Sequence, residues 1–214
     1  MSKGGSTTSG GGTGGVSGAN VKNRDSLVSA RNEGKQAEVD QTLGVIRDLN
    51  GEYGGGNLAD LHIVDLGGKD SGVIAFYDNG DNLAFNRSYF DKNLDSAYDK
   101  CVDSGFHPGR GKKTGIEAVA AHEYGHKLTY EAAAKMKTPG FGNIDGAARK
   151  IVDEARKETG DRGWQKMAKK ISGYASRNPA EAVAEACSDV YCNGNKAKKE
   201  SKAIMKVVKR IMQS

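Results

Sequence analysis

Two histidines and a glutamate stand near the middle of this 214-residue chain at a spacing that suits metal chemistry. The five residues from His122 to His126 read His-Glu-Tyr-Gly-His. Histidines four residues apart lie on one face of a helix, so both imidazoles can bind the same zinc ion. Glu123 occupies the neighbouring part of that face, where it can take a proton from a water that the metal activates. The pattern predicts a hydrolytic zinc site with His122 and His126 as ligands and Glu123 as general base.

The residues before this motif predict the helix that it requires. Thr114 and Glu117 match a capping box, in which a hydroxyl and a carboxylate satisfy the first free N–H groups of a helix. We expect this helix to run through His126 to about Lys135. Both histidines would then lie well inside regular helical structure.

A catalytic zinc ion needs a third protein ligand, and the other histidines are poor candidates. Position 132, six residues after His126, is alanine, which excludes the spacing of a three-histidine zinc peptidase. His62 and His107 both precede the motif, and neither belongs to a ligand-like pair. We expect His107 to be structural or to face the substrate.

Acidic residues on a second helix offer the third ligand. Asn178 and Pro179 predict where this helix starts, because asparagine caps helices and proline suits their first position. Glu181, Glu185 and Asp189 follow at intervals of four and share one face. Two assignments follow from this spacing. In the first, Glu181 binds the metal and Glu185 accepts a hydrogen bond from a ligand histidine. In the second, Glu185 binds the metal and Asp189 has the supporting role.

The segment from Ser172 to Ala186 resembles the downstream motif of the anthrax lethal factor-like metallopeptidases, which are zincins of the gluzincin type. In that family a tyrosine stands seven residues before the ligand glutamate and an Ala-Glu-Ala sequence follows, as here. The block His-Glu-Tyr-Gly-His is also similar to the His-Glu-Phe-Gly-His form of the family. The resemblance covers roughly residues 60–192. It implies Glu181 as the third zinc ligand, Tyr174 as a catalytic phenol that stabilises the oxyanion, and Glu185 as the partner of a ligand histidine.

A second resemblance concerns the loop Ser104–Pro108 and the block around Tyr174. Both are similar to peptidase-like domains at the C-terminal end of phage minor head proteins. The two resemblances imply a zinc-dependent endopeptidase that acts on a protein or peptide substrate and is encoded by a phage or mobile element. One alternative is a non-catalytic phage assembly protein that keeps a zincin fold and binds other phage structural proteins. Another is a DNA-associated protease.

The hydrophobic pattern predicts an α+β fold of the zincin type. Residues 1–34 are rich in glycine and serine and predict a flexible arm, whereas residues 35–214 predict one peptidase-like domain. After a helix at 35–50, short β-prone runs at 61–66, 73–77 and 83–85 predict a small, mostly antiparallel sheet with a hairpin at Asn79-Gly80. We expect residues 82–86 to form the edge strand that binds an extended substrate. Helices follow from Thr114 to the C-terminus.

The composition excludes several other classes of protein. A net charge of +5 is a mild basic excess, concentrated in lysines of the last helix, so nucleic acid is not an expected partner. Three cysteines without a Cys-x-x-Cys pair argue against a disulfide scaffold. No apolar run is long enough to cross a bilayer, and the N-terminus lacks a secretion signal. We therefore expect a protein that stays in the cytoplasm of the producing cell or is carried in a virion.

Overall fold

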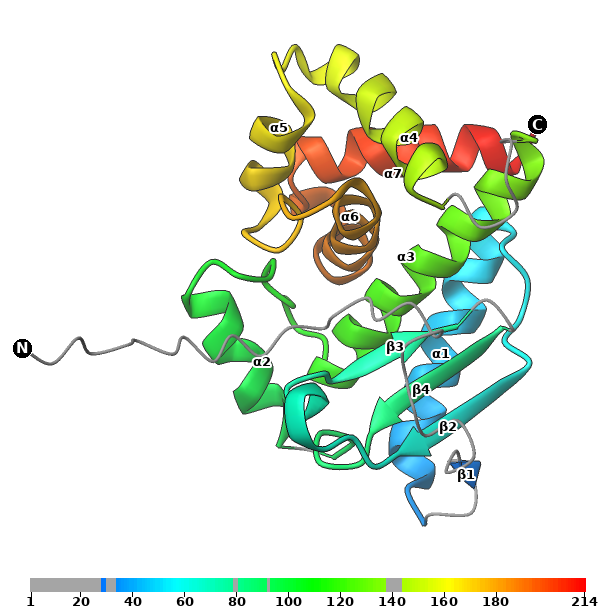
Figure 1. The fold of residues 1–214 in the computed structure, drawn as a ribbon, viewed down its shortest axis with the longest axis vertical. Helices are drawn as coiled ribbons and strands as arrows, with labels where there is room; N and C mark the ends of the chain where they lie inside the picture. The colour runs from blue at the N-terminus through cyan, green and yellow to red at the C-terminus, as the bar shows by residue number, and fades with distance from the viewer. Residues whose placement is uncertain (1–27, 30–33, 79–80, 92, 138–143) are drawn as a thin grey trace, which may run out of the picture.

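The computed structural model describes residues 28–29, 34–78, 81–91, 93–137 and 144–214. These residues form an α+β fold in which a small sheet and α1 lie at one end and α4 to α7 at the other, with α3 running between them (Figure 1). The strands are β1 (Val28–Ser29), β2 (Asp60–Val64), β3 (Ala75–Tyr77) and β4 (Asn82–Asn86). The α-helices are α1 (Gln36–Tyr53), α2 (Leu94–Asp103), α3 (Gly115–Lys135), α4 (Ile144–Thr159), α5 (Trp164–Ile171), α6 (Pro179–Asn193) and α7 (Lys199–Met212).

The sheet is mixed, with the strand order β1-β2-β4-β3. Two of its pairings are antiparallel, β1 with β2 and β3 with β4, but the five-residue pairing of β2 with β4 is parallel. The prediction that residues 82–86 form an edge strand is wrong, because β4 lies between β2 and β3. Leu83, Ala84 and Phe85 are all buried, as expected for an inner strand covered on both faces.

The predicted hairpin joins β3 to β4. The backbone N–H of Asp78 donates to the carbonyl oxygen of Asn82, 3.0 Å away, at the end of the antiparallel pair. Asn79 and Gly80 lie outside the described residues. Beside them, Asp81 has a positive φ of 62° and accepts hydrogen bonds from the Tyr77 hydroxyl and the buried Lys127 ammonium. Lys127 belongs to α3, so these contacts attach the hairpin to the helix that carries the histidine motif.

The predicted N-terminal arm lies almost entirely outside the described residues. Within residues 1–34 the structure describes Gly34 and the short strand β1, which pairs with β2. The predicted domain of residues 35–214 contains all the helices of the described chain and one main hydrophobic core. Within the described residues, no helix has both the length and the apolar character needed to cross a bilayer.

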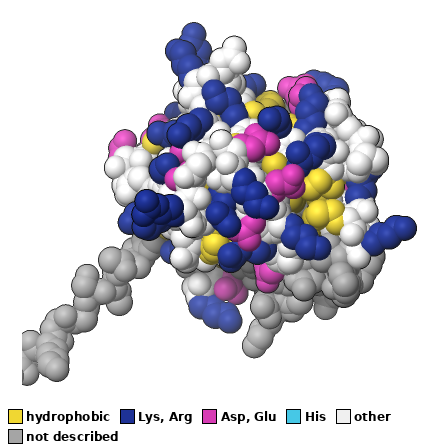
Figure 2. Space-filling model, turned by 90° about the horizontal axis from the view of Figure 1, so that it is seen from above, with side chains coloured by type: hydrophobic (Ala, Val, Ile, Leu, Met, Phe, Trp, Pro, Cys, Tyr) yellow, Lys and Arg dark blue, Asp and Glu magenta, His cyan; other side chains and the backbone are white. Residues whose placement is uncertain are grey.

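The last helix, α7, is amphipathic, with Ile204, Val207 and Val208 fully buried and lysines on its outer face. Ion pairs engage much of this charge: Lys206 with Glu158 at 3.0 Å, Lys209 with Glu52, and Arg210 with Glu154. Seen from the side of α4, α5 and α7, Lys and Arg side chains predominate on the surface, with fewer Asp and Glu side chains scattered between them (Figure 2). The basic helix is therefore part of a mainly basic face that also carries acidic side chains.

Candidate metal centre

The helix α3 carries the histidine motif, and its start is the predicted capping box. The Thr114 hydroxyl accepts a hydrogen bond from the backbone N–H of Glu117 at 3.2 Å, and the Glu117 carboxylate accepts one from the backbone N–H of Thr114 at 2.8 Å. His122 and His126 follow one turn apart in the buried middle of the helix. The local sequence therefore places both imidazoles on one face of a capped helix.

The helix α6 starts at the predicted cap and packs very closely on α3. The Asn178 side chain accepts a hydrogen bond from the backbone N–H of Glu181 at 2.9 Å, and Pro179 is the first helical residue. Where the two helices meet, a Cβ added at Gly125 would lie 2.7 Å from the Cα of Ala184 and 2.9 Å from the Cβ of Cys187. Only glycine permits this separation, which brings the first turn of α6 over the two histidines.

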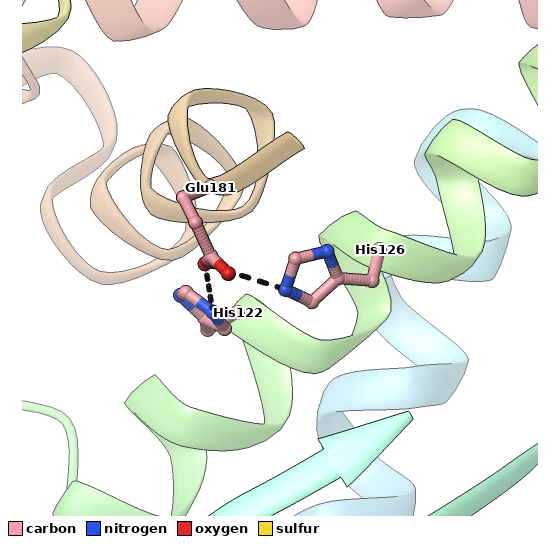
Figure 3. Close-up of side chains that lie close together, drawn as sticks. All are labelled: His122, His126 and Glu181. Carbon is pink, nitrogen blue, oxygen red and sulfur yellow. Dashed lines mark ion pairs between the residues drawn. The ribbon is translucent and has the colours of Figure 1, made fainter. Parts of the chain in front are cut away.

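Three buried side chains converge between these helices: His122 and His126 from α3 and Glu181 from α6 (Figure 3). Glu181 Oε2 lies 3.2 Å from His122 Nε2 and 3.5 Å from His126 Nε2. One ligand atom from each residue lies within 4.8 Å of the others, and none of the three residues is more than 6% exposed. The group has the composition and spacing of a metal site.

The unsatisfied atoms of this group support the same conclusion. The Nε2 atoms of His122 and His126 are buried and have no hydrogen-bond partner among the described residues. Burial raises the pKa of Glu181, but the imidazoles of His126 and His122 outweigh it and leave the pKa well below its usual value. A bound cation would satisfy this carboxylate and the two imidazole nitrogens, which face one another in a buried space. These residues therefore fit a bound metal ion.

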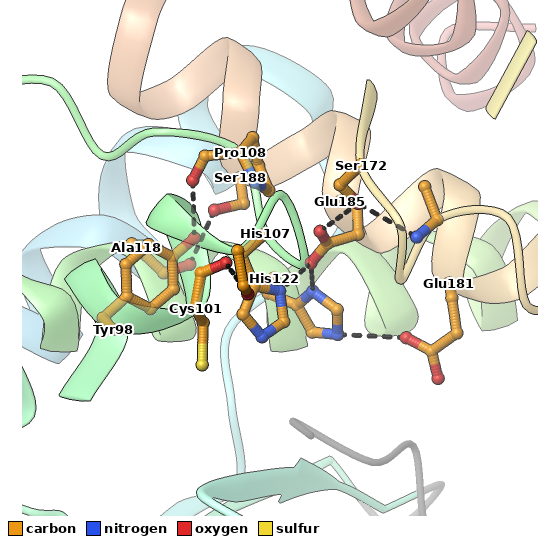
Figure 4. Close-up of polar contacts among 12 residues, drawn as sticks. Tyr98, Cys101, His107, Pro108, Ala118, His122, Ser172, Glu181, Glu185 and Ser188 are labelled. Atoms are coloured by element: carbon orange, nitrogen blue, oxygen red, sulfur yellow. Dashed lines mark hydrogen bonds and ion pairs between the residues drawn. The ribbon is translucent and has the colours of Figure 1, made fainter. Parts of the chain in front are cut away.

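Glu185 contacts His122 at Nδ1, on the side of the ring opposite the metal position (Figure 4). Its Oε1 lies 2.8 Å from His122 Nδ1 and 3.0 Å from His107 Nδ1, and its Oε2 accepts a 2.6 Å hydrogen bond from the Ser172 hydroxyl. Burial raises the pKa of Glu185, but His107 and His122 outweigh it and lower the pKa to about 2. Since an ionised carboxylate only accepts hydrogen bonds, both Nδ1 atoms carry protons. When the His122 imidazole is neutral, its Nε2 is then a lone pair that faces the metal position.

Of the two ligand assignments left open by the sequence, the geometry favours Glu181. Glu185 lies on the Nδ1 side of His122, away from Glu181. Asp189 accepts hydrogen bonds from the Asn193 side chain, the Lys198 backbone and the Ser201 hydroxyl. Asp189 therefore joins α6 to the start of α7 and has no role at the metal.

Glu123, the predicted base, is 1% exposed, and neither of its carboxylate oxygens has a hydrogen bond of ordinary geometry among the described residues. Burial is the main reason why the pKa of Glu123 lies above the usual value of a glutamate. The imidazoles of His122 and His126 and the backbone N–H of Tyr77 in β3 oppose this shift. A buried carboxylate with a raised pKa next to a metal position is suited to take up and release a proton.

Tyr174 is buried beside the first histidine. Its ring centroid lies 5.9 Å from that of His122 and 5.4 Å from that of His107. Backbone hydrogen bonds of 3.0 Å from Tyr174 to Phe106 and of 2.8 Å from Gly173 to Gly105 place this segment against the loop Ser104–Pro108. The loop Ser104–Pro108 and the segment around Tyr174 thus lie side by side at the site.

Two residues have roles at the site that the sequence did not assign. His107 was expected to be structural or to face the substrate, and it lies behind Glu185, stacked on Tyr98 with ring centroids 5.3 Å apart. Ser172 is the first residue of the segment that resembles the downstream motif, where no role was predicted for it, and its hydroxyl donates to Glu185. His62 lies apart in β2, where its Nε2 is 3.3 Å from the Asn82 side-chain oxygen.

No known protein family, curated protein or solved structure significantly matches this chain. The support for the metal centre is therefore the sequence and the geometry of this chain.

Proposed function

We propose that this protein is a zinc-dependent endopeptidase with a zincin-like fold, which hydrolyses peptide bonds in a protein substrate. The observation that carries the proposal is the buried group of His122, His126 and Glu181 next to the carboxylate of Glu123. Two imidazoles and one carboxylate are one of the ligand sets of catalytic zinc sites, which keep a fourth position open. Magnesium and calcium prefer sites made of oxygen ligands alone.

Zinc bound by these residues would lower the pKa of a water towards about 7 and polarise the carbonyl of the scissile bond. Glu123 would take a proton from the attacking water and deliver it to the leaving amine. Its burial supports this role, because the raised pKa brings proton uptake closer to neutral pH. Glu185 would keep His122 in the Nδ1-protonated form that leaves Nε2 free for the metal.

Tyr174 is the proposed donor to the oxyanion that forms when water attacks the carbonyl. Its position in the fold supports this role, because its ring lies next to His122 and is itself buried. Replacing Tyr174 by Phe is expected to lower kcat by a factor of about 10² with zinc affinity unchanged. An unchanged kcat would remove Tyr174 from the mechanism.

Glu123→Ala separates catalysis from metal binding, because it removes the proposed base and keeps all three ligands. Wild type and variant would be loaded with zinc and incubated with a diverse peptide library, and the products identified by mass spectrometry. We expect both proteins to hold one zinc ion and only the wild type to cleave. Zinc binding without cleavage by either protein would favour the alternative of a phage assembly protein that keeps the fold.

A phage or mobile-element origin and phage structural proteins as partners rest on the sequence resemblance alone. A role on DNA has no specific support in the structure, since Lys206, Lys209 and Arg210 of α7 are engaged by glutamates of the same chain.

A further inference from the structure

Arg177 is an exposed arginine whose position is fixed beside the metal centre. It directly precedes Asn178, the cap of α6, and its backbone N–H donates to the carbonyl oxygen of Tyr174 at 3.0 Å. Its guanidinium carbon lies 5.0 Å from the ring centroids of both Phe106 and Tyr174. Two aromatic rings thus hold this cation at one place on the surface.

The charge of Arg177 is available to a ligand. Within the described chain it forms no ion pair, unlike five other arginines that pair with aspartate or glutamate: Arg87, Arg110, Arg149, Arg156 and Arg210. A guanidinium that lies over aromatic rings keeps its N–H donors at its edge, in a planar fork that matches a carboxylate. Arg177 is therefore an ordered cation whose hydrogen-bonding edge is not used by an acidic residue of the described chain.

A single aromatic ring connects Arg177 to the proposed zinc ligands. The ring of Tyr174 that contacts the guanidinium also lies 5.9 Å from the ring of His122, measured between centroids. An extended peptide advances about 3.3 Å per residue. A peptide whose scissile bond lies at the metal centre would place a side chain within about three residues of that bond at Arg177.

We propose that Arg177 binds a carboxylate of the substrate, so that the protein selects peptides with Asp or Glu within about three residues of the cleaved bond. The inference rests on the proposed peptidase function for its class of substrate. A forked guanidinium–carboxylate pair supplies two parallel charge-assisted hydrogen bonds and fixes the direction of the bound chain. Arg177 is thus a specificity-determining residue.

The test measures binding, using zinc-loaded Glu123→Ala protein, which keeps the ligands and lacks the base. The immobilised protein is incubated with a library of short random peptides, and the retained peptides are sequenced by mass spectrometry. We expect Asp and Glu to be enriched about tenfold over Asn and Gln at one position. Adding Arg177→Glu is expected to shift the enrichment to Lys and Arg, whereas Arg177→Lys keeps a weaker preference for acids.

Arg162→Glu is the matched control, because Arg162 is also exposed and also lacks an ion pair within the described chain. We expect this control to keep the preference for acidic peptides. The inference is overturned if the Glu123→Ala protein shows no acidic enrichment, or if the enrichment survives Arg177→Glu. Failure of the proposed function has a different result: zinc-loaded wild type cuts no peptide, while Glu123→Ala still selects acidic peptides through Arg177.

Discussion

The separation of α3 and α6 at Gly125 sets the geometry of the metal centre, so Gly125→Ala is expected to weaken zinc binding. The added methyl would lie 2.7 Å from the Cα of Ala184, whereas ordinary contacts of this kind begin at 3.4 Å. The nearest atom is backbone and cannot rotate away, so α6 must move by roughly 0.7 Å or more. Glu181 moves with α6 while both histidines stay on α3.

A shift of this size exceeds the tolerance of about 0.2 Å that zinc–ligand distances allow. We therefore expect Gly125→Ala to bind zinc about 10- to 100-fold more weakly and to lose about 1–3 kcal/mol of stability. A chelator-competition titration measures the affinity, and thermal unfolding of the zinc-free protein measures the stability, at about 2–4 °C per kcal/mol.

Gly51→Ala is the control for this experiment. Gly51 lies in the helix α1, is exposed, and has no atom within 4 Å of an added Cβ. Alanine there is expected to leave zinc affinity unchanged and to stabilise the protein by up to about 1 kcal/mol. If Gly125→Ala bound zinc as tightly as Gly51→Ala, the close contact between the two helices would not determine the metal geometry.

Three further outcomes follow from contacts near the site. His107→Asn keeps an N–H donor close to the position of Nδ1, so we expect this variant to bind zinc as the wild type does. His107→Ala lacks the donor and is expected to bind zinc about tenfold more weakly. Equal zinc affinities of the two variants in a competition titration would show that His107 does not position Glu185. Zinc-loaded wild type is expected to melt at a higher temperature than chelator-treated protein, because zinc binds the folded state; Glu181→Gln is expected to lose most of this difference, and a full difference in the variant would exclude Glu181 as a ligand. Burial raises the pKa of Asp81, but the hydrogen bonds from Lys127 and Tyr77 outweigh burial and leave the pKa below its usual value. The ionised carboxylate therefore stabilises the folded state above about pH 4, and this stabilisation is lost as the pH falls further. The difference in melting temperature between wild type and Asp81→Asn is therefore expected to narrow between about pH 7 and about pH 3, and a constant difference would contradict the assignment.

The helices that carry the site could be predicted because their start signals are local. Thr114 with Glu117 and Asn178 with Pro179 each cap a helix within four residues of sequence, and both helices begin where these pairs indicate. The helix α2 was not predicted. Only Leu94 and Tyr98 are buried in it, so it lacks the longer apolar pattern that identifies a helix in a sequence.

The order of the strands could not be read from the sequence, because it depends on contacts between distant segments. The β-prone runs were found, but the insertion of β4 between β2 and β3 follows from a parallel pairing that no hairpin signal encodes. The same limit applies to the acidic row of α6. Glu181 and Asp189 share a helical face, yet eight residues separate them by about 12 Å along the axis, so they meet different partners.

The roles of Glu181 and Glu185 illustrate the difference between spacing and packing. Spacing alone left either glutamate as the ligand. Packing favours Glu181, because Glu185 contacts His107, which is 78 residues away in sequence, and the Nδ1 side of His122. The family resemblance implied the same choice, and the ion pairs of 3.2 Å and 3.5 Å from Glu181 to the two histidines agree with it.

The proposed function requires that His122, His126 and Glu181 hold one zinc ion. The most direct test is a crystal structure of the zinc-loaded protein with anomalous data collected on both sides of the zinc absorption edge. We expect one strong anomalous peak above the edge, about 2.0–2.2 Å from the Nε2 atoms of His122 and His126 and from a carboxylate oxygen of Glu181. An absence of zinc between these three side chains, or a peak held by other residues, would contradict it.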